Sequence, residues 1–195
     1  MSYFNERALQ ILNDKQFYKD LITTETKVQL LLEACTDAIK SSLEEFIPSD
    51  STLLKFSPKI TRGNNFLGYP WTIVDFPRNF ESDGFLALRT LCLRGHYFSC
   101  TLHLSGNVFK HYSKRLEERF QEIPGEYYVS INADEWMHII DEKNYEQIKE
   151  NDKELESKIK SSEYIKIARK ITFEEAESLP AKTAEMARIL FTILH

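Results

Sequence analysis

The stretch that decides the fold covers residues 85–104 and reads FLALRTLCLRGHYFSCTLHL. Two runs of strand-forming residues flank a short polar break that contains Gly95, a residue suited to a left-handed turn position. This pattern predicts a β-hairpin with strands at residues 85–93 and 96–104 and a three-residue loop at 93–95. In that register Cys92 lies opposite His96, and Arg89 lies opposite Ser99.

The predicted hairpin separates its side chains into two faces, because successive residues of a strand point to opposite sides. One face is apolar and carries Leu86, Leu88, Thr90, Cys92, Phe98, Cys100, Leu102 and Leu104. The other is more polar and carries Ala87, Arg89, Leu91, Tyr97, Ser99, Thr101 and His103. A two-residue loop would mix Arg89 with the apolar set, so the separation favours the three-residue loop.

Outside the hairpin, strands are expected at residues 57–62 and 71–76, and a second hairpin at 127–131 and 136–140. Residues 164–171 alternate as an outer strand would. Helices are expected at residues 5–12, 15–22, 25–47, 108–120, 150–161, 172–179 and 181–194. Hairpin strands with helices before, between and after them predict one α+β domain over residues 1–195. Its antiparallel, hairpin-built sheet would be packed by the long N-terminal helix and the C-terminal helices.

Composition is that of an ordinary soluble globular protein, with 42% hydrophobic and 28% charged residues and a net charge of −5. The first residues lack the basic and then apolar pattern of a secretion signal, and no apolar run approaches the roughly 20 residues that span a bilayer. Three cysteines, an odd number, fit a reducing compartment. We therefore expect a cytoplasmic protein without membrane association. The middle of the chain is only mildly basic, so no nucleic-acid partner is expected.

The first candidate site is an anion site formed by Arg62, Arg78 and Arg89, because arginine forks bind carboxylates and phosphates in a bidentate way. The turn after Arg62 could add polar groups, and nearby aromatic rings could stack on a planar ligand. In the alternative interpretation, Asp75 neutralises one arginine while Arg62 and Arg78 face water at strand ends. The additional candidate ligand-binding residues are Asn64, Asn65, Tyr69, Trp71, Asp75, Tyr97, Thr101 and His103.

A second candidate is the polar hairpin face itself. His103 could transfer protons while Arg89 holds a substrate's charge, which makes these two residues the candidate catalytic pair. The same face could instead be the solvated side of an antiparallel sheet. No spacing among histidines and cysteines indicates a metal site, and no motif indicates a cofactor. The last predicted helix is apolar around most of its circumference, which indicates either deep burial or a homodimer contact.

Four segments resemble uncharacterised bacterial proteins of similar length: Arg62-Gly63-Asn64-Asn65, Gly68-Tyr69-Pro70-Trp71, Asp75-Phe76-Pro77-Arg78 and residues 101–106. The resemblance implies a bacterial cytosolic protein and carries no function with it. Three functions therefore stay open from the sequence. They are a binding module for a small anionic ligand or acidic peptide, an enzyme that uses His103 and Arg89, and a scaffold that acts through homodimerisation.

Overall fold

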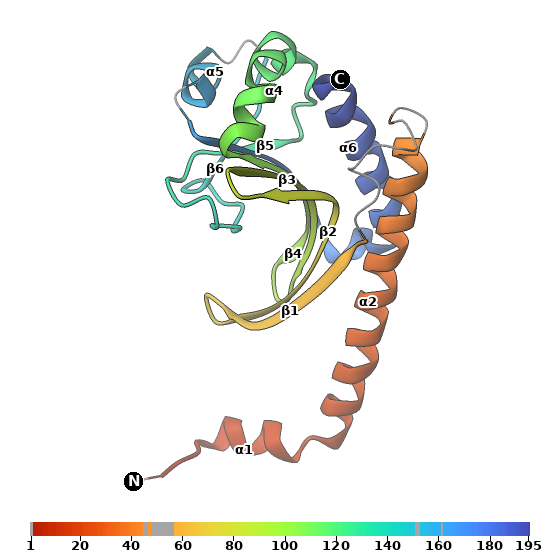
Figure 1. Ribbon diagram of the computed structural model, residues 1–195. Coiled ribbons are helices and arrows are strands. Elements are labelled where there is room, and N and C mark those ends of the chain that lie inside the picture. The colour runs from red at the N-terminus through yellow and green to blue at the C-terminus, as the bar shows by residue number, and fades with distance from the viewer. Residues whose placement is uncertain (1, 45–46, 48–56, 151–152, 161) are drawn as a thin grey trace.

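The computed structural model describes residues 2–44, 47, 57–150, 153–160 and 162–195. In this part of the chain, seven strands form one antiparallel sheet of order β1-β2-β3-β4-β7-β5-β6 (Figure 1). The strands are β1 (Lys59–Phe66), β2 (Tyr69–Glu81), β3 (Gly84–Leu93), β4 (Tyr97–Ser105), β5 (Tyr128–Ser130), β6 (Tyr145–Gln147) and β7 (Tyr164–Ile171). The helices and sheet confirm the predicted α+β class.

The β3–β4 hairpin confirms the predicted faces but corrects the predicted register. Leu93 pairs with Tyr97 across a loop of residues 94–96, in which Gly95 has a φ of 79°. Arg89 therefore lies opposite Thr101, not Ser99, and Cys92 lies opposite Phe98, not His96. The error is a shift of two residues along the partner strand. Because side chains alternate with a period of two, such a shift leaves every residue on its predicted face.

The helices are α1 (Glu6–Asn13), α2 (Lys15–Glu44), α4 (Gly106–Arg119), α5 (Lys153–Lys160) and α6 (Leu179–Leu194). The two helices predicted over residues 15–22 and 25–47 are one continuous helix up to Glu44, and residues 45–46 lie outside the described part. The predicted break after α1 is confirmed. Residues 173–178, expected to be α-helical, form a 3₁₀ helix, η2 (Phe173–Ser178).

The main core lies between the apolar hairpin face and the helices. Leu88 and Leu102 of the hairpin pack in one cluster with Ile39 of α2 and Leu190 of α6, all at most 1% exposed. Figure 1 shows α2 and α6 side by side along one face of the curved sheet. Because α6 is buried within the chain, its apolar circumference is explained by burial and does not require a homodimer contact.

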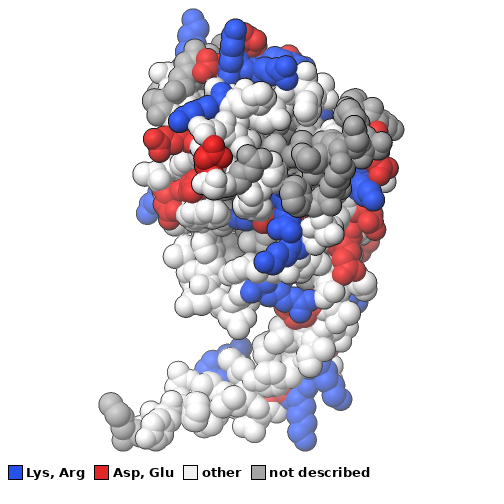
Figure 2. Space-filling model, in the orientation of Figure 1, with Lys and Arg blue, Asp and Glu red and all other residues white. Residues whose placement is uncertain are grey.

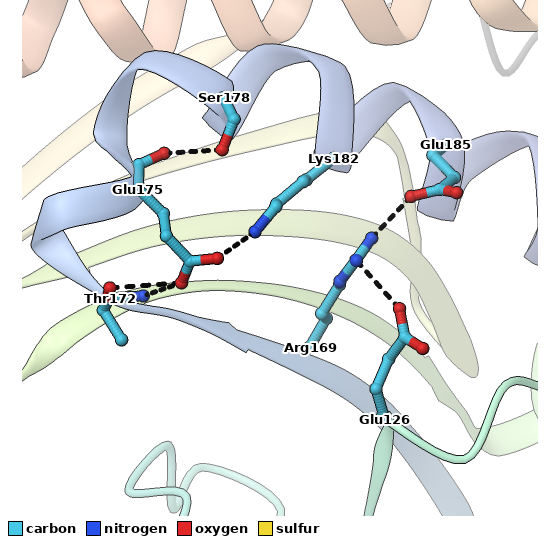
Figure 3. Close-up of polar contacts among 7 residues, drawn as sticks. All are labelled: Glu126, Arg169, Thr172, Glu175, Ser178, Lys182 and Glu185. Atoms are coloured by element: carbon cyan, nitrogen blue, oxygen red, sulfur yellow. Dashed lines mark hydrogen bonds and ion pairs between the residues drawn. The ribbon is translucent and has the colours of Figure 1, made fainter.

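Polar contacts fasten β7 to α6 at the edge of this core (Figure 3). Arg169 of β7 pairs with Glu126, 2.8 Å away, and with Glu185 of α6, 2.7 Å away. Glu175 accepts hydrogen bonds from the Thr172 backbone and hydroxyl and completes a capping box at the start of η2. These contacts fix the path of the chain from the sheet into its last helix.

The first strand of the predicted second hairpin is confirmed as β5, but its second strand, expected at residues 136–140, is wrong. β5 pairs with β6, whereas residues 131–144 contain no strand or helix and cross the sheet face opposite α2 and α6. We call residues 131–144 the crossing segment. Asx turns begin it, because side-chain oxygens of Asn132 and Asp134 accept backbone N–H groups two residues further on. β7 is also not an outer strand, since it lies between β4 and β5.

The surface carries both signs of charge. On the face seen in Figure 2, lysines and arginines are interspersed with acidic residues. Within the described residues, no helix has the length and apolar character needed to cross a membrane.

Candidate functional site

The polar hairpin face is built around an ion pair between adjacent strands. Arg89 of β3 and Asp75 of β2 are cross-strand partners. The guanidinium Nε donates to Asp75 Oδ1 at 2.7 Å and Nη2 donates to Oδ2 at 2.9 Å. Their side chains are only 10% and 15% exposed. The interpretation in which Asp75 neutralises an arginine within the sheet is therefore confirmed, and the pair holds the guanidinium in one fixed orientation.

The crossing segment adds a third residue, His138, next to the ion pair of Arg89 and Asp75. His138 Nε2 lies 3.0 Å from Arg89 Nη1. Burial and the charge of Arg89 lower the pKa of His138 to about 2, so its imidazole is neutral. A guanidinium can only donate, so Nε2 is the accepting nitrogen of that neutral ring. Arg89 is thus hydrogen-bonded on both sides, and it keeps N–H groups with no partner among the described residues.

These three residues lie at a cavity of about 420 Å³, which we call the first cavity. Its size falls within the usual range for small-molecule sites. Its walls are mostly aromatic and aliphatic, with few polar groups. The other lining residues are Thr61, Asn65, Phe66, Trp71, Ile73, Leu91 and Trp136. The first cavity therefore combines apolar walls with the hydrogen-bonding groups of Arg89, Asp75 and His138.

A buried lysine and a buried histidine lie next to this array. Lys166 of β7 is the cross-strand partner of His103 of β4, and their exposures are 0% and 1%. The Lys166 Nζ donates to the Met137 carbonyl. Burial, followed by the charge of Arg89, lowers the pKa of Lys166 to about 7. Burial and nearby cations lower the pKa of His103 to about 2. Burial therefore disfavours the charged forms of both side chains.

Side chains from the sheet fasten the crossing segment in place. The Tyr97 hydroxyl accepts a hydrogen bond from the Ile140 N–H at 2.6 Å, and the Tyr164 hydroxyl donates to the Asn132 carbonyl. Together with the bond from Lys166 to Met137, these contacts satisfy backbone groups that have no strand partner. Trp136 and His138 are thereby held at the first cavity.

The structure brings some predicted ligand-binding residues together. Asn65, Trp71, Asp75 and Arg89 all line the first cavity. Three other predicted residues share the polar face with Arg89: Tyr97, Thr101 and His103. They are buried and do not line the first cavity.

The three arginines predicted to form one anion site do not converge. Arg62 hydrogen-bonds to Gln29 of α2 and lines a separate cavity of about 290 Å³ that also includes Asn64 and Trp71. Arg78 donates to the Ser57 carbonyl at 3.2 Å and lines neither cavity. Tyr69 packs edge-on against His96, with ring centroids 4.3 Å apart. Of the three guanidinium groups, only that of Arg89 therefore lies at the first cavity.

The predicted anion site and catalytic pair did not include Trp136, His138 or Lys166. The first two fall in the segment expected to be a strand, and only its Asx-turn residues hinted at an irregular path. Lys166 resembled a solvent-facing residue of an outer strand. The small Ala168 on the same face was a weak signal that something covers that face of β7.

The catalytic interpretation gains no support from this geometry. His103 is 1% exposed, and neither ring nitrogen has a hydrogen-bond partner to orient it. Within the described part of the chain, no group of three or more histidines, cysteines and carboxylates could hold a metal. The cysteines are buried and free, and burial raises the pKa of Cys100 to about 12, which marks it as a core thiol.

Comparison with protein-family models, with curated proteins and with solved structures finds no match to this chain.

Proposed function

We propose that this protein binds a small organic anion with a flat apolar body in the first cavity. The observation that carries the proposal is the Arg89 guanidinium, fixed by Asp75 and His138 at a cavity with aromatic walls. A carboxylate or phosphate would take its remaining N–H groups as donors. Trp71 and Trp136 would contact the faces of the ligand's ring.

The surrounding charges favour an anion over a neutral molecule. Asp75 balances Arg89, but Lys166 has no carboxylate partner within 4.0 Å among the described residues. The pKa of Lys166 lies well below the ordinary value, first because the side chain is buried and then because the charge of Arg89 repels a second cation. A bound anion would offset that repulsion and favour the protonated lysine. Binding would therefore be accompanied by proton uptake near neutral pH.

Calorimetric titration of the full chain with benzoate tests the proposal, with benzamide as the neutral isosteric control. We expect benzoate to bind and benzamide to bind about tenfold more weakly, because only the anion gains charge-assisted hydrogen bonds. Equal affinity for the two compounds, or no binding of benzoate, would contradict the proposal.

Two variants locate the binding. Trp71→Leu removes a partly exposed wall of the cavity and should weaken benzoate binding several-fold. Arg89→Lys keeps the charge but removes the fork that engages Asp75 and the ligand together. Arg78→Lys is the matched control, because Arg78 lies on β2 outside the cavity. An equal loss of affinity in Arg78→Lys and Arg89→Lys would place the ligand elsewhere.

A further inference from the structure

Trp136 also lines a second, larger cavity of about 770 Å³. Its floor is the end of the sheet where Ser105 of β4 pairs with Tyr164 of β7, and part of its wall is the first turn of α4. At this end of the sheet the Gly106 N–H donates to the Glu163 carbonyl at 3.1 Å, and Gly106 forms a β-bridge with Gly84. The two cavities therefore share one aromatic wall.

The lining of the second cavity is negatively charged, whereas Asp75 and Arg89 balance each other in the lining of the first. Asp134, Glu135 and Glu163 line it, against a single lysine, Lys110. Within the described residues, none of these three carboxylates forms an ion pair with a lysine or arginine. A cluster of carboxylates alone would be a solvated surface, so a second observation is needed to indicate a ligand.

His103 supplies that observation: it is not itself a lining residue, but it lies against the lining residues Glu135, Trp136 and Tyr164. Its side chain is 1% exposed, and both Nδ1 and Nε2 lack a hydrogen-bond partner. Nε2 points at Glu135, with 3.7 Å between Nε2 and Oε2, which is too long for a hydrogen bond. The low pKa of His103, about 2, keeps the imidazole neutral, so it does not form an ion pair with that carboxylate. A buried imidazole with no partner is costly, and a neutral one offers an accepting lone pair.

Aromatic rings pack around the His103 imidazole. The His103 ring lies edge-on to Trp136 and Tyr164, with centroids 5.6 Å and 5.9 Å away. Both of these rings line the second cavity. Aromatic faces next to carboxylates are a common recognition surface for organic cations.

We propose that the second cavity binds an organic cation, a primary ammonium or guanidinium group, between the Glu135 carboxylate and the His103 imidazole. Such a group donates several hydrogen bonds, so it can satisfy an accepting nitrogen and a carboxylate at once. Trp136 and Tyr164 contact the attached carbon chain or ring. This inference does not depend on the proposed function of the first cavity.

The first experiment is calorimetric titration of the full chain with 2-phenylethylamine, with 2-phenylethanol as the neutral match. The amine is expected to bind about tenfold more tightly than the alcohol, because only the amine gains a charged hydrogen bond. Glu135→Gln should weaken amine binding about tenfold. Glu142→Gln, an exposed change on the same crossing segment, should leave it unchanged. Equal binding of amine and alcohol, or unchanged affinity in Glu135→Gln, overturns the proposal.

A second measurement reads His103 directly. In ¹⁵N-labelled protein, the amine should shift the ring nitrogen signals of His103, whereas the alcohol should not. Unmoved signals at amine saturation overturn the proposal.

Trp71→Leu separates the two cavities, because Trp71 lines the first and not the second. Amine affinity that persists in this variant supports a site of its own. Amine affinity that is lost together with benzoate affinity overturns it.

Discussion

The two faces of the sheet are covered in different ways. On the apolar face, α2 and α6 bury aliphatic side chains, and the contacts are non-directional. On the polar face, an irregular segment is fastened by hydrogen bonds from Tyr97, Tyr164 and Lys166 to its backbone. The apolar face therefore stabilises the fold through the area it buries. The polar face depends on individual polar contacts that fix the positions of charged side chains. The two should respond differently to substitution and to pH.

The largest effect is expected on the apolar face. Leu102→Ala removes a fully buried side chain from the main cluster and should lower the free energy of unfolding by about 2–5 kcal/mol. Its neighbour on the opposite face, Thr101→Ala, should cost about 1 kcal/mol or less. Urea denaturation of both variants measures the contrast. Equal losses would show that the polar face is packed as tightly as the helix-covered one.

The next effect concerns Lys166 and pH. Its pKa is lowered from 10.5 to about 7 in the folded chain. Between these values the unfolded chain binds a proton that the folded chain does not bind, so stability rises as pH rises through this range. The full change is of the order of a few kcal/mol. Urea denaturation of the wild type and of Lys166→Met, from about pH 6 to about pH 10, measures it.

Lys166→Met has no side-chain charge at any pH and should lose this rise. It should also be more stable relative to wild type at the acidic end of the range, where the buried ammonium is most costly. A parallel pH dependence in the two proteins would mean that Lys166 titrates normally. Lys170→Met, on the same strand, is the matched control.

A smaller effect tests how the crossing segment is fastened. Tyr97→Phe removes the acceptor of the Ile140 N–H and should cost about 1–2 kcal/mol, because that buried donor is left unsatisfied. Amide hydrogen exchange should speed up in residues 137–141, which surround the lost hydrogen bond at Ile140. It should stay unchanged in α6. Tyr112→Phe on α4 serves as the control. If exchange at Ile140 is unaffected, the hydroxyl does not hold the segment.

The smallest effect is on ligand affinity. Benzoate is expected to bind several-fold more weakly as pH rises from about 6 to about 9, because the bound anion favours the protonated form of Lys166. The same titration with Lys166→Met should show no such slope. A wild-type affinity that is independent of pH would separate Lys166 from the first cavity.

The sequence predicts the helix-covered face well and the polar face poorly, for physical reasons. Alternation in residues 85–104 determines which side chains face the helices, and that assignment survives the two-residue register error. Helical periodicity likewise places α6 and most of α2, although α2 was expected as two helices. The path of residues 131–144 depends on hydrogen bonds to side chains far away in the sequence, such as Tyr97, and no local pattern records these. The same limit hid the convergence of His138 with Arg89.

The contact between Gly84 and Gly106 determines how far the second cavity can be altered. A Cβ on Gly106 would lie 2.1 Å from the Asp83 carbonyl oxygen, and one on Gly84 would lie 2.5 Å from that of Ser105. Gly106 also has a φ of 59°, which favours glycine. Main-chain atoms thus leave no room for a side chain at Gly84 or at Gly106, and Gly106 lines the second cavity. A change in the size of the second cavity would therefore have to come from lining side chains such as Trp136.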